Sequence, residues 1–256
     1  MRIVVKIGTS TLAHATGLLN IRRVEGLCKV LSDIKNAGHE VILVSSGAIG
    51  MGVGKLGLRE RPRDIPSKQA AAAVGQCELM YVYDKLFSER HHTVAQLLIT
   101  GDDIENEIRH RNFRNTLGRL LELGALPILN ENDTVATEEL GIGDNDTLAA
   151  IVAKSVGADL LILLSDIEGL YTADPHSDPN AKLLPLITEV DETIRSLAGV
   201  STSGQGTGGM VTKLKAAEIC LSCGCDMVIA SGQEPNNLYD ILDGKAIGTK
   251  FTRRDL

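Results

Sequence analysis

Short apolar segments alternate with longer segments of helical periodicity along most of the chain, and this alternation restricts the fold more than any other feature. Strands are predicted at residues 2–7, 40–45, 93–99, 126–129, 159–164 and 226–230. Helices are predicted at residues 21–36, 67–87, 112–123, 146–156 and 210–222. Several strand segments are apolar throughout, which is typical of parallel strands covered on both faces. The pattern predicts an α/β fold, a three-layer α/β/α sandwich around a mostly parallel central sheet.

The charge and composition argue against nucleic-acid and membrane partners. The chain carries 33 acids and 26 bases, a formal net charge of −7, whereas binding to a phosphate backbone needs clustered cations. Aromatic residues make up 3% and Trp is absent, so a base-stacking surface is not expected. No apolar run reaches the roughly 20 residues of a membrane span, and charges interrupt the first apolar segment, unlike a signal peptide. We expect a cytoplasmic protein.

The chain shows neither an internal repeat nor a flexible linker, and its 43% of hydrophobic residues suffice for one sizeable core. Residues 171–185 contain two Asp-Pro pairs and are predicted to form an exposed loop. We therefore expect one domain over residues 1–256.

The five cysteines, an odd number without a secretory signal, indicate reduced thiols rather than a disulfide framework. Cys220, Cys223 and Cys225 could begin a zinc site, but no Cys or His lies at a spacing that suits a fourth ligand. We interpret Cys220 as the end of a helix and Cys225 as the entry to a strand, both acting as small apolar residues. No metal held by protein side chains is expected.

Glycine-bearing segments follow predicted strands or open predicted helices at residues 6–10, 45–52 and 204–210, and the third opens the helix that carries Lys213. Ligands of open α/β sheets bind beyond the carboxyl ends of the strands. Glycine lets backbone N–H groups approach an anion closely, and a helix N-terminus adds partial positive charge. Each segment alone could be a simple turn, but together they favour a polyphosphate ligand.

Standard nucleotide-binding motifs do not explain these glycines. The P-loop pattern and the protein-kinase catalytic loop are both absent from the sequence. Gly204, Gly206 and Gly209 match G-x-G-x-x-G, but they follow a helical segment and a loop rather than a strand. This context excludes the dinucleotide fingerprint of an NAD-binding oxidoreductase. The residues by themselves indicate a phosphate-handling α/β protein, such as a kinase without a P-loop.

Two polar loops, Asn-Glu-Asn-Asp at 130–133 and Gly-Asp-Asn-Asp at 143–146, fall at the same predicted edge. Asp144 and Asp146 stand at a helix start, where acids are commonly caps. Acids at a ligand-binding edge also suit an α-amino group, or a carboxylate that orients a lysine. The sequence leaves both interpretations open for each aspartate.

Six segments together resemble the amino acid kinase family, and the resemblance runs from residue 1 to the end of the chain. They are Lys6-x-Gly8-Thr9-Ser10, Ser-Ser-Gly-Ala-Ile at 45–49, the two polar loops, Ser-Asp-Ile-Glu-Gly-Leu-Tyr at 165–171 and Gly-Thr-Gly-Gly-Met-Val-Thr-Lys at 206–213. The set is most similar to the branch that phosphorylates the side-chain carboxylate of L-glutamate with ATP. That reaction gives L-glutamyl 5-phosphate in the first step of proline biosynthesis.

The resemblance implies roles for particular residues. Lys6 and Lys213 resemble the lysines that neutralise the transferring phosphoryl group, and Asp146 resembles the acid that holds both. Glutamate-binding positions are implied at Ser46, Asp133 and Asn145. ATP-binding positions are implied at Lys6, Gly8, Ser165, Asp166, Thr207, Gly208, Gly209, Met210, Val211, Thr212 and Lys213. The family often has Thr where this chain has Ser165, which keeps the hydroxyl.

The resemblance also implies cofactors and partners. Mg²⁺ is expected to bind through the ATP phosphates, and the acceptor-binding part is expected to precede the ATP-binding part along the chain. Relatives are dimers or tetramers, proline commonly inhibits them, and a reductase consumes the unstable acyl phosphate. The C-terminal PUA domain of many relatives is not expected after the final segment of this sequence.

Two alternatives remain open at this point. The first is another member of the family with a different acceptor, such as acetylglutamate, aspartate, carbamate or a nucleoside monophosphate. A nucleotide acceptor would need extra cations for its phosphate, and an acetylated acceptor lacks the free amino group that the acids suit. The second is a sensor that binds an amino acid or nucleotide without turnover, although a sensor has no need of two clamping lysines.

Overall fold

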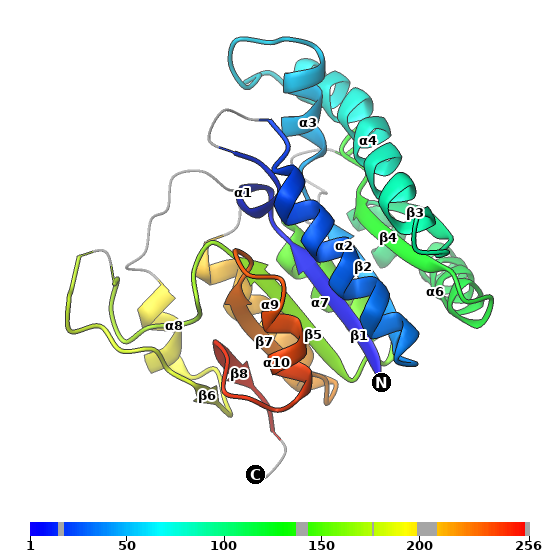
Figure 1. Ribbon diagram of the computed structural model, residues 1–256. Helices are drawn as coiled ribbons and strands as arrows, with labels where there is room; N and C mark the ends of the chain where they lie inside the picture. The colour runs from blue at the N-terminus through cyan, green and yellow to red at the C-terminus, as the bar shows by residue number, and fades with distance from the viewer. Residues whose placement is uncertain (15–17, 137–142, 176, 199–208, 254–256) are drawn as a thin grey trace.

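Eight strands form one sheet in the order β3-β4-β2-β1-β5-β7-β8-β6 within the residues that the computed structural model describes, 1–14, 18–136, 143–175, 177–198 and 209–253 (Figure 1). The strands are β1 (Arg2–Ile7), β2 (Glu40–Ser45), β3 (Val94–Ile99), β4 (Leu126–Glu131), β5 (Leu160–Ser165), β6 (Leu186–Ile187), β7 (Asp226–Ser231) and β8 (Thr249–Phe251). The six strands from β3 to β7 in this order are parallel, whereas β8 runs antiparallel to β7 and β6 runs parallel to β8. The predicted α/β fold with a mostly parallel sheet is confirmed.

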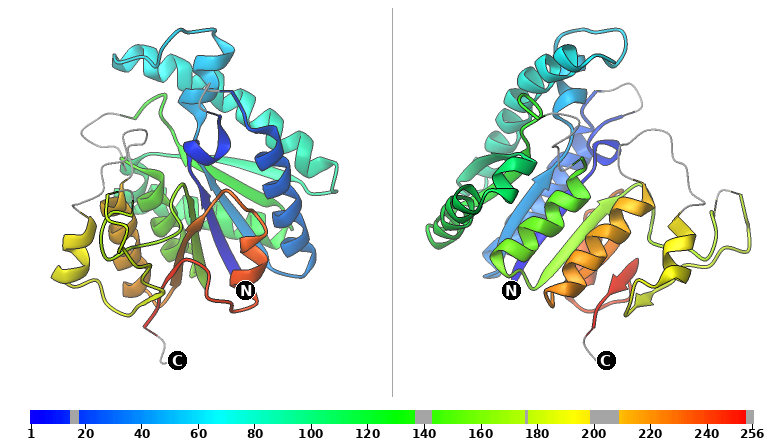
Figure 2. Two further views of the ribbon diagram at one scale, coloured as in Figure 1. Left: turned by 60° about the vertical axis from the view of Figure 1, so that its left-hand side comes forward. Right: turned by 180° about the vertical axis from the view of Figure 1, so that it is seen from behind.

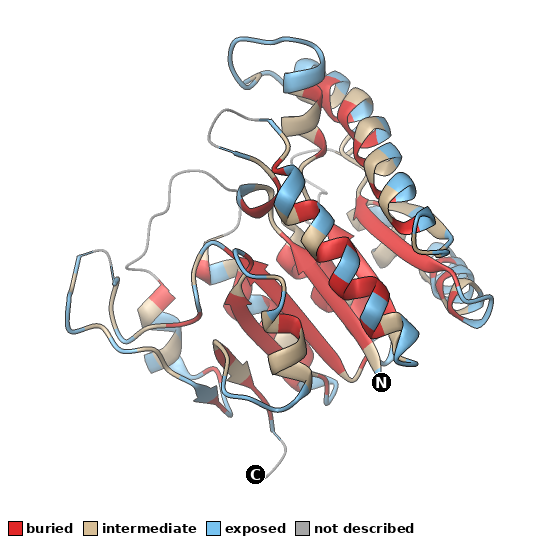
Figure 3. Ribbon diagram, viewed as in Figure 1, coloured by how far each residue is buried: buried red, intermediate tan, exposed pale blue. Residues whose placement is uncertain are grey.

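Helices cover both faces of this sheet, as the apolar strands require. They are α1 (Thr9–Leu12), α2 (Ile21–Asn36), α3 (Ala48–Lys55), α4 (Ile65–Ser88), α5 (Gly101–Glu105), α6 (Glu107–Glu122), α7 (Asn145–Val156), α8 (Glu192–Ala198), α9 (Met210–Ser222) and α10 (Asn237–Leu242). One hydrophobic cluster contains buried residues of α2, α4 and α10, and the other contains residues of α6, α7, α8 and α9. Figure 2 shows the second set from behind, and Figure 3 shows the buried sheet between the layers.

The two-residue period of β1 determines which face each side chain takes. Ile3, Val5 and Ile7 belong to the cluster under α2, whereas Val4 belongs to the cluster under α7 and α9. Lys6, two residues after Val4, therefore points to the side of the sheet on which α7 and α9 pack. This alternation is the first step in assembling the site described below.

The α3–α4 pair depends on two glycines at its closest approach. A Cβ on Gly52 would lie 1.8 Å from the carbonyl oxygen of Ala71, and one on Gly75 would lie 1.7 Å from that of Ala48. Only glycine fits at such distances. Residues 50–52, which the sequence suggested as part of a phosphate-binding turn, belong to α3, and Gly52 serves packing against α4.

The predicted long elements agree with the structure to within a few residues, and the short ones were missed. The α6 helix begins at Glu107, earlier than expected, because Asn106 caps it by accepting hydrogen bonds from the backbone of Ile108 and Arg109. The strands β6 and β8 have two and three residues, too few for a periodic signal. Segment 171–185 contains no helix or strand of its own among its described residues, in agreement with the predicted loop.

The cysteine interpretation is confirmed in its packing. Cys220 lies buried in α9 and Cys225 lies buried just before β7, and both belong to the hydrophobic cluster beneath α9. Among the described helices, none has both the length and the apolar character that a membrane span requires.

Candidate active site

A cleft lies at the carboxyl ends of β1, β2, β4 and β5, where the chain leaves the parallel strands and leads into helices. Its lining includes Lys6, Gly8, Ser46, Arg61, Asn130, Asp133, Asp144, Asn145, Asp146, Ser165, Asp166 and Lys213. In the sheet, β1 has β2 on one side and β5 on the other, so the connections diverge at this point. Such a divergence is where open α/β sheets bind ligands.

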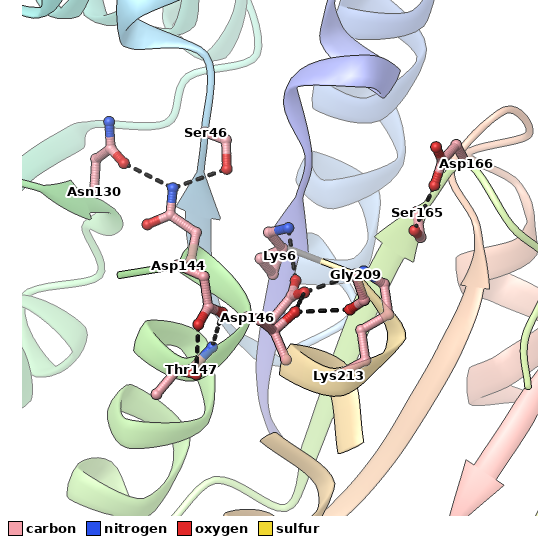
Figure 4. A network of polar contacts seen from close by, with 12 residues as sticks. Lys6, Ser46, Asn130, Asp144, Asp146, Thr147, Ser165, Asp166, Gly209 and Lys213 are labelled. Atoms are coloured by element: carbon pink, nitrogen blue, oxygen red, sulfur yellow. Dashed lines mark hydrogen bonds and ion pairs between the residues drawn. The ribbon is translucent and has the colours of Figure 1, made fainter. Parts of the chain in front are cut away.

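The centre of the cleft is a buried cluster of two lysines on one aspartate (Figure 4). Lys6 comes from β1, Asp146 from the first turn of α7, and Lys213 from the start of α9. Lys6 Nζ lies 2.6 Å from Oδ1 of Asp146, and Lys213 Nζ lies 3.1 Å from Oδ2. All three residues are buried: Lys6 is 9% exposed, Lys213 is 5% exposed and Asp146 is 1% exposed. Three segments far apart in sequence thus hold two cations around one anion.

The environment of Asp146 keeps it ionised. Burial alone would raise the pKa of this carboxyl, but the charges of Lys6 and Lys213 outweigh burial, and the pKa lies below its ordinary value. The hydroxyl of Thr212 adds a hydrogen bond of 2.9 Å to Oδ2. The cluster therefore carries one net positive charge, directed at the cleft, and suits an anionic group such as a phosphoryl group in transfer.

A network of amides forms a second part of the site, on the side of β2 and β4. Asn145 donates through Nδ2 to Oγ of Ser46 at 2.8 Å and to Oδ1 of Asn130 at 2.9 Å. Asn130 in turn donates to Oε1 of Gln76 at 3.0 Å. Gly47 follows Ser46 with a φ of 108°, a left-handed conformation that glycine adopts without strain and that turns the chain into α3.

The acceptor oxygen of Asn145 is buried and has no hydrogen-bond partner within the part of the chain that the structure describes. Its Nδ2 group is already engaged, so the orientation of the amide fixes this oxygen as an available acceptor. A buried acceptor left unpaired is unfavourable. A ligand that donates a hydrogen bond at this position, such as an ammonium group, would remove the penalty.

The two aspartates at the start of α7 have different roles. Asp144 is the N-cap: one carboxylate oxygen accepts from the backbone N–H of Thr147 at 2.7 Å, and the other accepts from its hydroxyl at 2.8 Å. Asp146 makes no such cap and faces the lysines instead. Of the two roles that the sequence left open, the helix cap belongs to Asp144 and the orientation of lysines belongs to Asp146.

Asp133 lines the cleft from the loop after β4, together with a cation, Arg61, that the sequence did not single out. Burial raises the pKa of Asp133, and the charge of Arg61 opposes this rise. Arg61 belongs to the exposed connection between α3 and α4 and lines the same cleft. No local pattern distinguishes it from Arg59 and Arg63 on the same connection.

The residues expected to bind ATP are brought together only in part. Gly8, Ser165 and Asp166 line the cleft, and the hydroxyl of Ser165 donates to Asp166 at 3.0 Å. Gly209 is the N-cap residue of α9, and Met210 is buried in the core beneath that helix. Val211 is exposed, and Thr207 and Gly208 lie outside the described residues.

Three site contacts were not anticipated from the sequence. Asn130 and Gln76 support Asn145 from β4 and α4, and the single O–H of Thr212 has two acceptors within reach, Oδ2 of Asp146 at 2.9 Å and the carbonyl of Gly209 at 2.8 Å. Asn130 stands in a polar loop that the sequence marked, whereas Gln76 lies in the middle of a long helix without any local signal.

The sequence is similar to proteins of one family over nearly its whole length. A sequence model of the amino acid kinase family matches residues 1–231. The glutamate 5-kinase of Clostridium perfringens is 52% identical and aligns over 99% of this chain and 96% of its own length. That of Moorella thermoacetica is 52% identical over 99% of this chain and 67% of its own length. That of Listeria monocytogenes is 51% identical over 99% of this chain and 93% of its own length.

Solved structures share the fold at much lower identity. The isopentenyl phosphate kinase of T. acidophilum has a TM-score of 0.69 and 19% identity, over 98% of this chain and 100% of that one. The carbamate kinase from Giardia lamblia has a TM-score of 0.69 and 18% identity, over 99% of this chain and 98% of that one. These likenesses establish the arrangement of sheet and helices.

Proposed function

The chain belongs to the amino acid kinase family, and we propose that it transfers the γ-phosphoryl group of ATP to the side-chain carboxylate of L-glutamate. The products are L-glutamyl 5-phosphate and ADP, and the reaction opens proline biosynthesis. The observation that carries this proposal is the buried Lys6–Asp146–Lys213 cluster beside an amide network with one free acceptor. The names of relatives at 51–52% identity support the choice of glutamate.

The chemistry needs no general base, because a glutamate side chain with an ordinary pKa of about 4.3 is already ionised near neutral pH. A carboxylate oxygen forms the new bond to the γ-phosphorus while the bond from phosphorus to the β–γ bridging oxygen breaks and ADP leaves. Catalysis then depends on in-line positioning and on stabilising the charge of the transferring group. Lys6 and Lys213 supply that charge from two directions, and Asp146 keeps both ammonium groups in place.

The residues at the cleft fit a nucleotide with its metal ion. Bound ATP would supply the phosphoryl group, and Mg²⁺ would supply neutralisation of the phosphate charge. Lys6 and Lys213 would hold the γ-phosphate end, and Gly8 would offer its backbone at the end of β1. Ser165 and Asp166 would contact the remainder of the nucleotide from the end of β5, as would Gly209 at the start of α9.

The acceptor side favours an amino acid with a free α-amino group. The unpaired oxygen of Asn145 and the carboxylate of Asp133 both attract an ammonium group, and N-acetylation removes that group. Ser46, which directly follows β2, accepts a hydrogen bond from Asn145 and supports it. These features favour glutamate over acetylglutamate, and the buried lysine pair favours turnover over simple sensing.

The test is an assay of the purified protein with ATP and Mg²⁺, in which hydroxylamine traps the acyl phosphate and ADP release is followed in parallel. L-Glutamate, N-acetyl-L-glutamate and L-aspartate serve as acceptors, since the first two differ only at the amino group. Hydroxamate with glutamate alone supports the proposal. Preference for N-acetylglutamate or aspartate would assign another acceptor to the same lysines, and no product from any acceptor would favour a sensor.

We further propose the setting in which this reaction takes place. The protein acts in the cytoplasm as one domain, in which the N-terminal part binds the acceptor and the C-terminal part binds ATP. It assembles into a dimer or tetramer, proline inhibits it, and a reductase consumes its unstable product. If millimolar proline leaves the dependence of rate on glutamate unchanged, the inhibition is not a property of this chain.

A further inference from the structure

Arg61 is a cation in the cleft wall that the reaction outlined above does not use. It belongs to the connection between α3 and α4, drawn in cyan above the carboxyl ends of the strands in Figure 1, and it lines the same cleft as Lys6 and Asn145. Within the described residues no carboxylate lies within ion-pair distance of its guanidinium, whereas Arg2 and Arg109 each have one such carboxylate and Arg195 has two. A cation at the ligand-binding edge is thus available to a ligand.

Arg61 shares the lining of the cleft with an anion. Asp133, on the loop after β4, also lines the cleft, and the charge of Arg61 acts on its carboxyl without an ion pair between them. The two walls are connected, because Gln69 in the second turn of α4 donates to the carbonyl of Ala136, three residues after Asp133, at 3.4 Å. Opposite charges that line one cleft without pairing leave room for a ligand that carries both charges.

We propose that Arg61 binds the α-carboxylate of the acceptor amino acid, while Asp133 and Asn145 receive its α-ammonium group. This inference rests on the proposed function and adds to it the residue that selects the α-carboxylate. With the zwitterionic end held between these walls, the side-chain carboxylate of the acceptor extends toward Lys6 and Lys213. A guanidinium presents paired donors that match a carboxylate, which an ammonium group does not.

The experiment compares L-glutamate with its α-amide, isoglutamine, which keeps the ammonium group and the side-chain carboxylate but has a neutral α-carboxamide. The wild-type protein should prefer glutamate, because hydrogen bonds to charged groups contribute more than those to neutral ones. In Arg61→Leu, kcat/KM for glutamate should fall by about tenfold, since the arginine is exposed. The kcat/KM for isoglutamine should change by less than about twofold, so most of the preference is lost.

Two further variants separate binding from other effects. Arg61→Lys should recover part of the preference, because it keeps the charge but not the paired donors. Arg63→Leu is the matched control: Arg63 is exposed on the same connection but does not line the cleft, and the preference should stay at the wild-type value. The thermal midpoint of each variant shows whether the fold is kept.

The outcomes distinguish this inference from the function on which it rests. If the wild-type protein makes no hydroxamate from glutamate, the proposed function fails. If it does, but Arg61→Leu lowers kcat/KM for glutamate and for isoglutamine by the same factor, Arg61 does not bind the α-carboxylate. A rise in the KM for ATP with an unchanged KM for glutamate would assign Arg61 to the nucleotide and would also overturn the inference.

Discussion

The two halves of the cleft position their polar groups by different means. On the side of α9, Lys6 and Lys213 are held by full charges around the buried Asp146, and the cluster is internally paired before any ligand arrives. On the side of β2 and β4, Asn145 is held by neutral hydrogen bonds and keeps one acceptor unpaired. The first half is therefore built for one chemistry, charge stabilisation, whereas the second is built to discriminate between ligands. Substitutions in the first half should reduce turnover, and those in the second should change acceptor affinity.

The largest effect is expected from Asp146→Asn, which leaves two buried ammonium groups without their anion. Turnover should fall by about 10³-fold, since both lysines lose their fixed positions. The free energy of unfolding should fall by about 3 kcal/mol, as when one partner is removed from a buried ion pair. Hydroxamate formation at saturating substrates and denaturant unfolding measure the two effects. A variant with turnover within tenfold of the wild-type protein would contradict the role of Asp146.

The loss of stability caused by Asp146→Asn should depend on pH, and the ion pairs of Asp146 determine the direction of that dependence. Because the pKa of Asp146 is lowered in the folded state, its ionisation stabilises the fold above its ordinary value of 3.8. That stabilisation is lost as the pH falls through the folded-state pKa. The stability difference between the wild-type protein and Asp146→Asn should thus be full at neutral pH and shrink below about 4. A difference that stays constant down to the acid-unfolding limit would exclude ionisation as its source.

Lys213→Ala should reduce kcat by about 10²-fold, because it removes one of the two cations directed at the transferring group. The KM for glutamate should change little, since the amide network is untouched. Lys215→Ala is the matched control on the same helix, because that lysine is exposed. Equal effects of the two substitutions would show that loss of any α9 lysine is enough, which would remove the specific role of Lys213.

Asn145→Ala tests the other half of the cleft and should raise the KM for glutamate by about tenfold, with a smaller change in kcat. It removes the acceptor for the ammonium group together with the hydrogen bonds to Ser46 and Asn130. The KM for ATP is the internal control and should stay within about threefold of the wild-type value. An effect mainly on the KM for ATP would move Asn145 to the nucleotide side.

The half of the site that contains the lysines could be predicted from the sequence more fully than the half that contains the amides. Lys6 and Lys213 follow or precede glycines at predicted element ends, so their convergence at one sheet edge could be predicted. The division of roles between Asp144 and Asp146 could not be, because both stand in the same helix start and only the packing of α7 against β1 and α9 directs one of them inward.

Features that depend on distant contacts gave no local signal. Gln76 is one polar residue in a long helix, and its bond to Asn130 spans 54 positions in the chain. Arg61 is one of three arginines on an exposed connection, and only the tertiary structure places it at the cleft. The helix α3 was missed because Gly50, Gly52 and Gly54 lower its intrinsic propensity, while packing against α4 compensates.

The smallest expected effect is the change in thermal midpoint caused by Asp133→Asn, which tests whether Asp133 serves ligand binding or the stability of the fold. The pKa of this carboxyl is raised in the folded state, so its ionisation costs stability at neutral pH and costs nothing below its ordinary value of 3.8. Asp133→Asn should therefore raise the thermal midpoint at pH 7 by about 1–2 °C, with no gain near pH 3.5. The same variant should raise the KM for glutamate several-fold, because the ammonium group loses its anion. A carboxylate retained at a cost to folding is what a binding role predicts; a lower midpoint at pH 7 would instead make Asp133 a structural residue.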